Sequence, residues 1–528
     1  MRKVRIIIVA VLLLMSIAGC SNKNTVPKTT NTAGGSATPA EIVSASPAAI
    51  STITPTPSPV EPSKAPTVEP ITNKTGLPLN EFTLDITLNA KKHKLVVKQS
   101  IVYNNNTGKE LRDIYFNLIP EAFKKQGGGI TMKSMTVANK ACKLKQVKET
   151  VYKINLPSKL PAGEKTTILL EYEVHIPKLQ NRFGYQKSVF NLGNFIVTPA
   201  VYNKDDWSVE PYVDLGDAFY TDVANYTVTI HAPKGYKVAA TGKDDGNGTY
   251  HIENVRDFAF CASDSYETLQ ETYDGTVITV YYGDHITKTA TRVMDSAKKS
   301  LKLFNEAYGK YPYETLNLVV NGLSSGIGGM EYPTLIMLSP EFTIELLETW
   351  NEFKNHPEEI ETYLNNIDSP TCHEIAHQWF YGIVGNDQIS YPWLDEGFCR
   401  YSQYLYQEAY PPEEVGKTYS WLKQRLEREH YDVLHSDDIT YVKDEIYLNE
   451  SLYYWMDTDQ MAYSFIYEKG ASLLYQMEHK MGQEEFLKAV REYVQEFAYQ
   501  FVTPDSFKQY WNSKGDFTEL FNLYFKNK

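Results

Sequence analysis

The chain has 528 residues, which exceeds the size of a single small domain and predicts a multidomain protein. Hydrophobic residues make up 42% of it and charged residues 22%, which is typical of chains that fold around real cores. The formal net charge of -13, without a long block of Lys and Arg, argues against nucleic acid as a partner, because phosphate binding needs clustered positive charge.

The first twenty residues are typical of a targeting segment. Three basic residues precede an apolar run from Ile6 to Met15, which is too short to span a bilayer. The ending Ile17-Ala18-Gly19-Cys20 resembles a bacterial lipobox, in which the cysteine becomes the lipidated first residue of the mature protein. We therefore expect residues 1–20 to be a lipoprotein signal peptide and Cys20 to anchor the protein by lipid to the extracellular face of the cell membrane. An ordinary cleaved signal peptide is the alternative.

Residues 21–76 consist mostly of Thr, Pro, Ser, Ala and Val, with Thr54-Pro55-Thr56-Pro57-Ser58-Pro59 at the centre. This composition cannot bury enough apolar surface to fold. It predicts a disordered linker that holds the folded part away from the membrane.

Residues 77–270 carry the signals of β-strands. Phe82, Leu84, Ile86 and Leu88 alternate with polar residues, and the segment from Ile168 to Val174 has a similar period of two. We expect an N-terminal β-domain here. The aromatic stretch from Phe195 to Tyr212 is more often core than the lining of a cleft.

Residues 271–528 are expected to form a second, mainly helical domain. Apolar residues from Thr287 to Tyr308 recur at helical spacing, and Leu316 to Val320 is typical of a strand. From Ser369 onward the pattern is mostly helical. Cys142, Cys261, Cys372 and Cys399 lack metal-finger or paired redox spacing, so we interpret them as free, buried thiols, with a disulfide as the alternative.

The segment His373-Glu374-Ile375-Ala376-His377 stands within this helical half. Residues four apart lie on one face of a helix, so both imidazoles can reach one ion while Glu374 projects beside it. Pro370 suits the first turn of that helix. The spacing predicts a zinc site with His373 and His377 as ligands.

A zinc ion held by two histidines needs a third protein ligand and an open position for water. Glu396 lies nineteen positions after His377, at the start of the apparent helix Trp393-Leu394-Asp395-Glu396-Gly397-Phe398. Zinc lowers the pKa of bound water to about 7, and Glu374 can then accept a proton as the general base.

These motifs, followed by Gln378-Trp379-Phe380, resemble the gluzincin aminopeptidase family, which includes membrane alanyl aminopeptidase and leukotriene hydrolase. Two further pieces fall in family order. Gly328-Gly329-Met330-Glu331-Tyr332 resembles the family's Gly-x-Met-Glu-Asn strand, and Tyr467-Glu468-Lys469-Gly470 resembles the segment with its catalytic tyrosine. The resemblance implies an N-terminal all-β, saddle-like domain followed by a thermolysin-like, mainly helical catalytic domain with a small mixed sheet.

The resemblance also implies roles for individual residues. Tyr467 would donate a hydrogen bond to the oxyanion of the tetrahedral intermediate, and Glu331, within the substrate-binding segment Gly328, Gly329, Met330 and Glu331, would hold the free α-amine of the substrate. Together with one Zn²⁺ per chain bound by His373, His377 and Glu396, this predicts an aminopeptidase acting on extracellular peptides.

Two departures from the family pattern leave other functions open. Tyr332 replaces the usual Asn, and the sequence does not identify the second amine-binding residue that relatives contribute from the β-domain. An endopeptidase or an epoxide hydrolase on the same site, or a catalytically inactive peptide-binding protein, are the alternatives. The chain ends about 130 residues after Glu396, so we expect a two-domain enzyme with an open cleft that tolerates longer peptides.

Overall fold

The computed structural model describes residues 70–283, 285–320, 323, 327–339, 343–350, 354, 360–411, 446–458 and 462–526. These residues all lie in the unit Pro66–Lys528 of the chain. The expected signal peptide, nearly all of the expected linker and Cys20 lie outside the described residues, so these expectations stay predictions.

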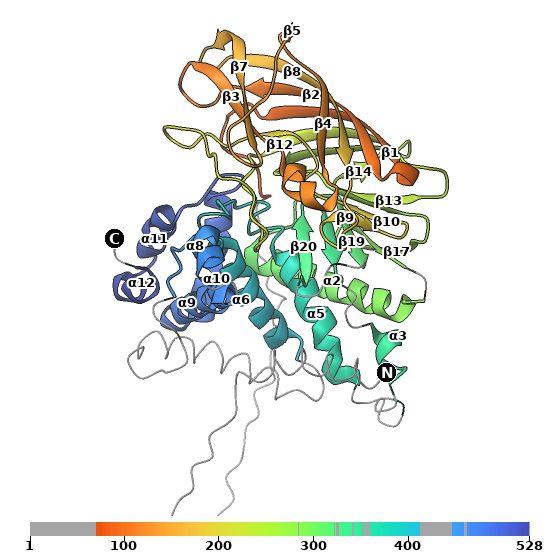
Figure 1. Ribbon diagram of the computed structural model, residues 1–528. Helices are drawn as coiled ribbons and strands as arrows, with labels where there is room; N and C mark the ends of the chain where they lie inside the picture. Colours follow the sequence, from red (N-terminus) through yellow and green to blue (C-terminus); the bar gives the residue numbers. More distant parts are fainter. Residues whose placement is uncertain are drawn as a thin grey trace, which may run out of the picture. The chain divides into compact units, whose positions relative to one another are not determined.

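An eight-stranded sheet is the largest element of the N-terminal half (Figure 1). Side chains of the strand that begins at Asn80 alternate between buried and exposed, as the period of two predicts. Neighbouring strands are antiparallel except for the parallel pair β1 and β12. In sheet order the strands are β14 (Lys243–Asp244), β15 (Thr249–Val255), β12 (Ala224–His231), β1 (Asn80–Asn89), β2 (Lys94–Asn104), β8 (Lys165–His175), β4 (Gly129–Val137) and β5 (Lys140–Ala141).

Two four-stranded sheets and two short 3-10 helices complete this half. The sheets are β13 (Lys237–Ala240), β16 (Phe260–Ser263), β10 (Val189–Leu192) and β9 (Phe183–Gln186), and β11 (Thr198–Pro199), β3 (Leu111–Asn117), β7 (Val151–Leu160) and β6 (Lys145–Gln146); the 3-10 helices are η1 (Ala90–Lys92) and η2 (Ile119–Gln126). Phe195, Trp207 and Tyr212 are buried in the common core, so this aromatic stretch is core, as expected. The same core continues to Met330 and Tyr332 of the C-terminal half.

A five-stranded mixed sheet begins the C-terminal half. In sheet order its strands are β17 (Glu267–Tyr273), β18 (Thr276–Tyr282), β19 (Thr315–Val320), β21 (Leu335–Leu338) and β20 (Gly329–Tyr332). The three central strands are parallel, and the two edge strands pair antiparallel with them. The domain boundary expected at residue 270 falls within β17.

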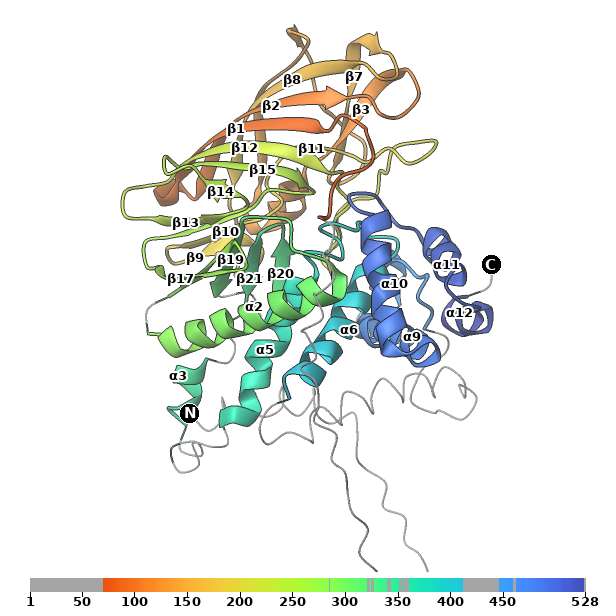
Figure 2. The same cartoon turned by 180° about the vertical axis from the view of Figure 1, so that it is seen from behind.

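Helices pack against this sheet and against one another. They are α2 (Thr287–Tyr308), α3 (Ile344–Leu347), α5 (Ile360–Ala376), α6 (Trp393–Ala409), α8 (Leu452–Asp457), α9 (Phe465–Met481), α10 (Gln483–Glu496), α11 (Pro504–Asn512) and α12 (Thr518–Tyr524), with the 3-10 turn η5 (Ala462–Ser464). Helix α2 lies across the sheet and contacts α5, as Figure 2 shows. Helices α6 and α9 cross closely at two glycines, because a Cβ on Gly470 would lie 2.7 Å from the Cα of Gly397. The all-β half followed by a mainly helical half with a mixed sheet confirms the expected fold.

Pro370 is not in the first turn of its helix, so that prediction was wrong. Helix α5 begins at Ile360 and contains Pro370 in its interior. An interior proline removes one backbone hydrogen bond, and tertiary contacts offset this loss here. Asp368 accepts hydrogen bonds from Arg292 Nε at 2.8 Å and Ser296 Oγ at 3.1 Å, both on α2, which holds the turn around Pro370 in place.

A buried arginine joins the two halves. Arg256, next to the end of β15, donates through Nε to the carbonyl of Tyr381 at 2.8 Å and through Nη2 to that of Gln500 at 2.9 Å. Its Nη1 donates to Thr221 O at 3.3 Å, and its guanidinium lies 4.4 Å from the ring centroid of Phe501. One side chain therefore ties three loops together.

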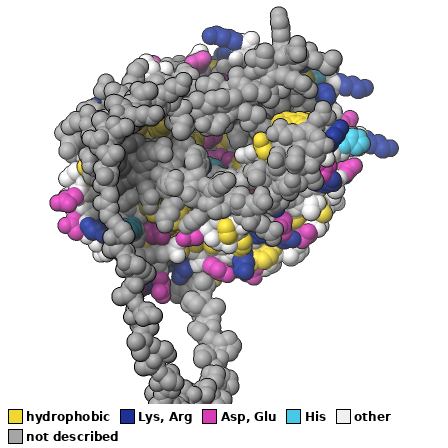
Figure 3. All heavy atoms as spheres, turned by 90° about the horizontal axis from the view of Figure 1, so that it is seen from below, with side chains coloured by type: hydrophobic (Ala, Val, Ile, Leu, Met, Phe, Trp, Pro, Cys, Tyr) yellow, Lys and Arg dark blue, Asp and Glu magenta, His cyan; other side chains and the backbone are white. Residues whose placement is uncertain are grey.

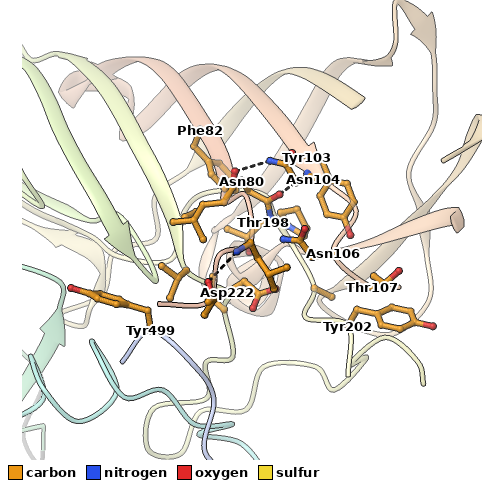
Figure 4. A pocket seen from close by; sticks show the side chains of 18 of the residues that line it. Asn80, Phe82, Tyr103, Asn104, Asn106, Thr107, Thr198, Tyr202, Asp222 and Tyr499 are labelled. Atoms are coloured by element: carbon orange, nitrogen blue, oxygen red, sulfur yellow. Dashed lines mark hydrogen bonds between the residues drawn. The ribbon is translucent and has the colours of Figure 1, made fainter. Parts of the chain in front are cut away.

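A pocket of about 230 Å³ opens beside this junction (Figure 4). Tyr103, Tyr202, Asp222 and Tyr499 are among the side chains around it. The negative charge of Asp222 counteracts the lowering of the Arg256 pKa by burial.

Charged side chains of both signs are interspersed on the described surface visible from below (Figure 3). Among the described residues, no helix is long and apolar enough to cross a bilayer. Within the described part of the chain these four cysteines form no disulfide. Cys261, Cys372 and Cys399 are buried, as expected, whereas Cys142 is only half-buried.

Candidate metal centre and active site

Two imidazoles and one carboxylate converge at the meeting point of α5 and α6. His373 lies in the last turn of α5 and His377 in the turn that directly follows Ala376, with their Nε2 atoms 3.2 Å from each other. Glu396, in the first turn of α6, places Oε2 at 3.1 Å from His373 Nε2 and 3.5 Å from His377 Nε2. His377 and Glu396 are almost fully buried. The structure thus brings together the three predicted ligands.

The chemistry of these three atoms fits a divalent metal ion. His377 Nδ1 lies 3.2 Å from the carbonyl of Phe380, so a neutral ring donates there and turns the lone pair of Nε2 toward the other two groups. An imidazole lone pair and a carboxylate oxygen repel each other unless a proton or a metal ion lies between them. Ligand atoms about 2.0–2.1 Å from a tetrahedral zinc lie about 3.3 Å apart, which matches the observed spacing. The expectation of a metal-binding group is confirmed.

Electrostatics keep the carboxylate of this group ionised. Burial alone would raise the pKa of Glu396, but hydrogen bonds with His373 and His377 lower it to about 2. Burial also disfavours charge on the imidazole of His373 and lowers its pKa. Burial lowers the pKa of His377 too, but the neighbouring Cys399 and Glu331 raise it well above its usual value. An anionic Glu396 is the ligand state that a metal ion requires, and binding of the ion to His377 would displace a proton.

Glu374 projects from the same helix toward β20. A Cβ built on Gly329 of β20 would overlap the carboxyl carbon of Glu374 and lie 2.5 Å from its Oε1, so a residue without a side chain is needed there. Burial raises the pKa of Glu374 well above its usual value, while His377 lowers it and Glu331 raises it. Glu374 thus adjoins the metal group, and its role as general base stays a prediction.

Tyr467, in the first turn of α9, faces the same group. Its hydroxyl donates to Glu396 Oε1 at 2.6 Å, and its ring stacks on His373 with centroids 6.0 Å apart. The close crossing of α6 and α9 explains this placement, because Gly397 follows Glu396 and Gly470 lies one turn after Tyr467. The helices bring the phenol and the carboxylate together from positions 71 residues apart.

Glu331 is buried on β20 and faces the same centre. Burial and the neighbouring carboxylate of Asp217 raise its pKa to about 7. Met330 is buried in the core and Gly328 is exposed at the start of the strand, so these two neighbours differ in environment. Of the four predicted substrate-binding residues, Glu331 therefore brings a charge to the site and Gly329 makes room for Glu374.

Asp217 is the residue of this centre that the sequence did not identify. It lies in the loop between β11 and β12 and accepts a hydrogen bond from the buried Arg182. Its negative charge also acts on Glu374 and Tyr467, so the β-domain contributes a carboxylate to the site. No local motif marks it, because only the tertiary fold brings this loop to β20.

Tyr332, which departs from the family pattern, points away from the metal group. Its hydroxyl donates to Asn194 Oδ1, and Asn194 Nδ2 donates to Asp257 Oδ2 at 2.9 Å. A Cβ on Gly193 would overlap the Tyr332 hydroxyl, so the β-domain leaves space for this ring. Tyr332 therefore contributes a contact between the two halves.

A turn of helix with two histidines, a carboxylate from the next helix and an adjacent glutamate define a metal centre of the type found in zinc hydrolases. Residues 292–524 match the Peptidase family M1 domain. This part of the chain is therefore similar to an M1 peptidase domain, which confirms the resemblance drawn from its motifs.

Curated relatives cover part of the chain. Aminopeptidase M1-B of Oryza sativa subsp. japonica is 28% identical over 232 residues, which are 43% of this chain and 24% of that protein. Membrane alanyl aminopeptidase of Heliothis virescens is 24% identical over 302 residues, 53% of this chain and 28% of that protein. The chain thus spans about a quarter of the length of these relatives.

A solved structure matches most of the fold. The crystal structure of an M1 zinc metallopeptidase from Deinococcus radiodurans superposes with a TM-score of 0.56 at 17% identity, and the match covers 84% of this chain and 91% of that one. The two-part architecture is therefore a fold that this M1 enzyme also has.

Proposed function

We propose that the chain is a zinc-dependent metallopeptidase that removes N-terminal residues from peptides. The observation that carries the proposal is the convergence of His373, His377 and Glu396 beside the buried Glu374. The M1 domain match and relatives named as aminopeptidases support the same conclusion.

The residues divide the work of peptide hydrolysis among them. Zinc held by the two histidines and Glu396 supplies the Lewis acidity that makes water a nucleophile near neutral pH. Glu374 takes the proton from the attacking water and later delivers it to the leaving amine. Tyr467 donates its phenol proton in a hydrogen bond to the developing oxyanion.

The specificity for N-terminal residues follows from the two carboxylates beside the metal group, Glu331 and Asp217. Glu331 and Asp217 bring two carboxylates from opposite halves of the chain close enough to raise the pKa of Glu331. An ammonium group between them makes charge-assisted hydrogen bonds that an acetylated terminus does not make. Asp217 is the β-domain residue that completes amine binding in this proposal.

The proposed location is the outer face of the bacterial membrane, with Cys20 lipidated. The basic start, the short apolar run and the Thr/Pro/Ser-rich segment after Cys20 support it. Expression of the Cys20→Ser variant tests it: the variant protein should appear in the medium, while the parent chain stays with the membrane fraction. Equal release of both proteins would contradict lipid anchoring.

Cleavage of one peptide in free-amine and N-acetylated form tests the activity. The zinc-loaded chain should remove residues from the free terminus, and Glu374→Gln should lower kcat by about a thousandfold while zinc stays bound. Internal cleavage of both peptides at similar rates would identify an endopeptidase. A zinc-loaded chain that cleaves neither peptide would contradict the proposal altogether.

A further inference from the structure

A glutamine in the loop before α6 connects two buried carboxylates. Gln388 Nε2 donates to Asp395 Oδ2 at 2.6 Å and to Glu331 Oε1 at 3.2 Å. All three side chains are at most 3% exposed. One amide therefore links the start of α6 to the carboxylate that the proposed function places on the substrate amine.

The orientation of this amide follows from its surroundings. Both neighbouring atoms are carboxylate oxygens, which accept hydrogen bonds, so the NH₂ end must face them. The opposite end, Gln388 Oε1, is buried and has no hydrogen-bond partner among the described residues. The side chain thus satisfies Glu331 and Asp395 while its own acceptor stays unpaired.

The loop that carries Gln388 is itself tightly held. Asp387 Oδ1 accepts the backbone N–H groups of Ile389 and Ser390, each at 3.1 Å, and Gly385 N donates to Gln500 O at 2.9 Å. A side chain on such a turn has little freedom. The Gln388 amide therefore holds Glu331 Oε1 by a hydrogen bond from a rigid loop.

We propose that Gln388 is a positioning residue that gives the site its selectivity for a free N-terminal amine. By donating to Glu331 Oε1, the Gln388 amide fixes the carboxylate so that Glu331 Oε2 can face the substrate ammonium. The inference rests on the proposed function, in which Glu331 binds that ammonium.

A neutral donor suits this task better than a charged one. Arg or Lys in place of Gln388 would neutralise Glu331 and compete with the substrate for its carboxylate. A hydrophobic residue would leave the carboxylate without support, and the side chain would turn away from the productive geometry. An amide fixes the direction of Glu331 without adding a positive charge that would compete with the substrate ammonium.

Asn386 offers a matched control in the same loop. Its Nδ2 donates to Asp395 Oδ1 at 2.9 Å and to the carbonyl of Tyr391 at 3.2 Å, but it makes no hydrogen bond with Glu331. Gln388→Met and Asn386→Leu each remove one hydrogen bond from Asp395 with little change in shape. Only the first removes support from Glu331.

The test measures amine selectivity as the ratio of dissociation constants for the N-acetylated and free-amine copies of one peptide. Calorimetry on the metal-free full chain gives this ratio without turnover, and steady-state kinetics on the zinc-loaded chain give KM and kcat. Gln388→Met should lower the ratio about tenfold and raise KM for the free-amine peptide more than it lowers kcat. Gln388→Asn, which is one methylene shorter and keeps the side chain polar, should do the same.

A double-mutant cycle separates this inference from the proposed function. Glu331→Gln alone should lower the ratio, and Gln388→Met should lower it no further in that background. An unchanged ratio in Glu331→Gln would show that the amine-binding role itself is wrong. A lowered ratio in Glu331→Gln, together with an unchanged ratio in both Gln388 variants, would overturn the inference alone.

The control variant and the folding of each variant complete the experiment. Asn386→Leu should leave the ratio unchanged, and an equal fall in Asn386→Leu and Gln388→Met would show that both act only through Asp395. If neither Gln388 variant folds, Gln388 is a structural residue and the assignment is overturned.

Discussion

The contact between Gly329 and Glu374 allows a sharp test of how the general base is placed. In Gly329→Ala the new Cβ would lie 2.5 Å from Glu374 Oε1, whereas ordinary van der Waals contact is 3.4–4 Å. The carboxylate must therefore retreat by about 1 Å, and a misplacement of that size costs about a hundredfold in rate, or about 3 kcal/mol of transition-state stabilisation. Backbone strain does not contribute, because φ of Gly329 lies outside the left-handed region.

The assay is kcat/KM for a free-amine peptide, measured beside zinc content. Gly329→Ala should lose activity with its zinc retained, because the three atoms nearest to the new methyl group all belong to Glu374. Gly328→Ala is the control, because its Cβ would lie 3.9 Å from the nearest atom, on Pro370. The fold-loss in kcat/KM of Gly328→Ala should be at least about tenfold smaller than that of Gly329→Ala. Activity of Gly329→Ala within about threefold of the parent chain would refute this account of Glu374.

Three further predictions test other parts of the structure. Tyr467→Phe should lower kcat about a hundredfold with zinc still bound, because it removes one donor to the oxyanion; full activity in steady-state assays would contradict that role. Gly470→Ala should push α6 from α9 and destabilise the fold by roughly 1–3 kcal/mol in urea unfolding, with weaker zinc binding, and an unchanged midpoint would contradict the tight crossing. Burial raises the pKa of Asp257 to about 7, so the folded chain holds a proton that the unfolded chain releases. Stability should fall by up to about 4 kcal/mol as pH rises from about 4 to about 7 and then level off. Asp257→Asn should reduce the slope of stability against pH in urea unfolding across that range, leaving the contribution of Glu331, whose pKa is also raised to about 7. An identical slope would refute the assignment.

The sequence predicted those features that repeat locally. The alternation along Asn80–Asn89 specifies a strand with one buried face, and the spacing of His373 and His377 specifies two ligands on one helical face. Glu396 and Tyr467 were also predicted, because the motifs around them resemble a known family. In each case a short stretch of sequence carries the whole signal.

Features that depend on the meeting of distant segments could not be predicted in this way. Asp217 and Gln388 reach Glu331 from a β-domain loop and from the turn before α6, and neither stands in a recognisable motif. The start of α5 was placed too late, since a proline usually marks the first turn of a helix and only contacts of Asp368 with α2 show that this one does not. From the sequence, the replacement of Asn by Tyr332 left the substrate-binding role of this strand open. In the structure Tyr332 instead contacts Asn194 of the β-domain, which the sequence alone could not show.

The location of the metal ion tests the central claim most directly. Diffraction data collected at the zinc absorption edge from crystals of the zinc-loaded chain would place the ion without reference to activity. The account predicts one zinc per chain, within about 2.0–2.2 Å of His373, His377 and Glu396. A zinc ion bound elsewhere, or a Glu396 carboxylate turned away from the ion, would contradict it.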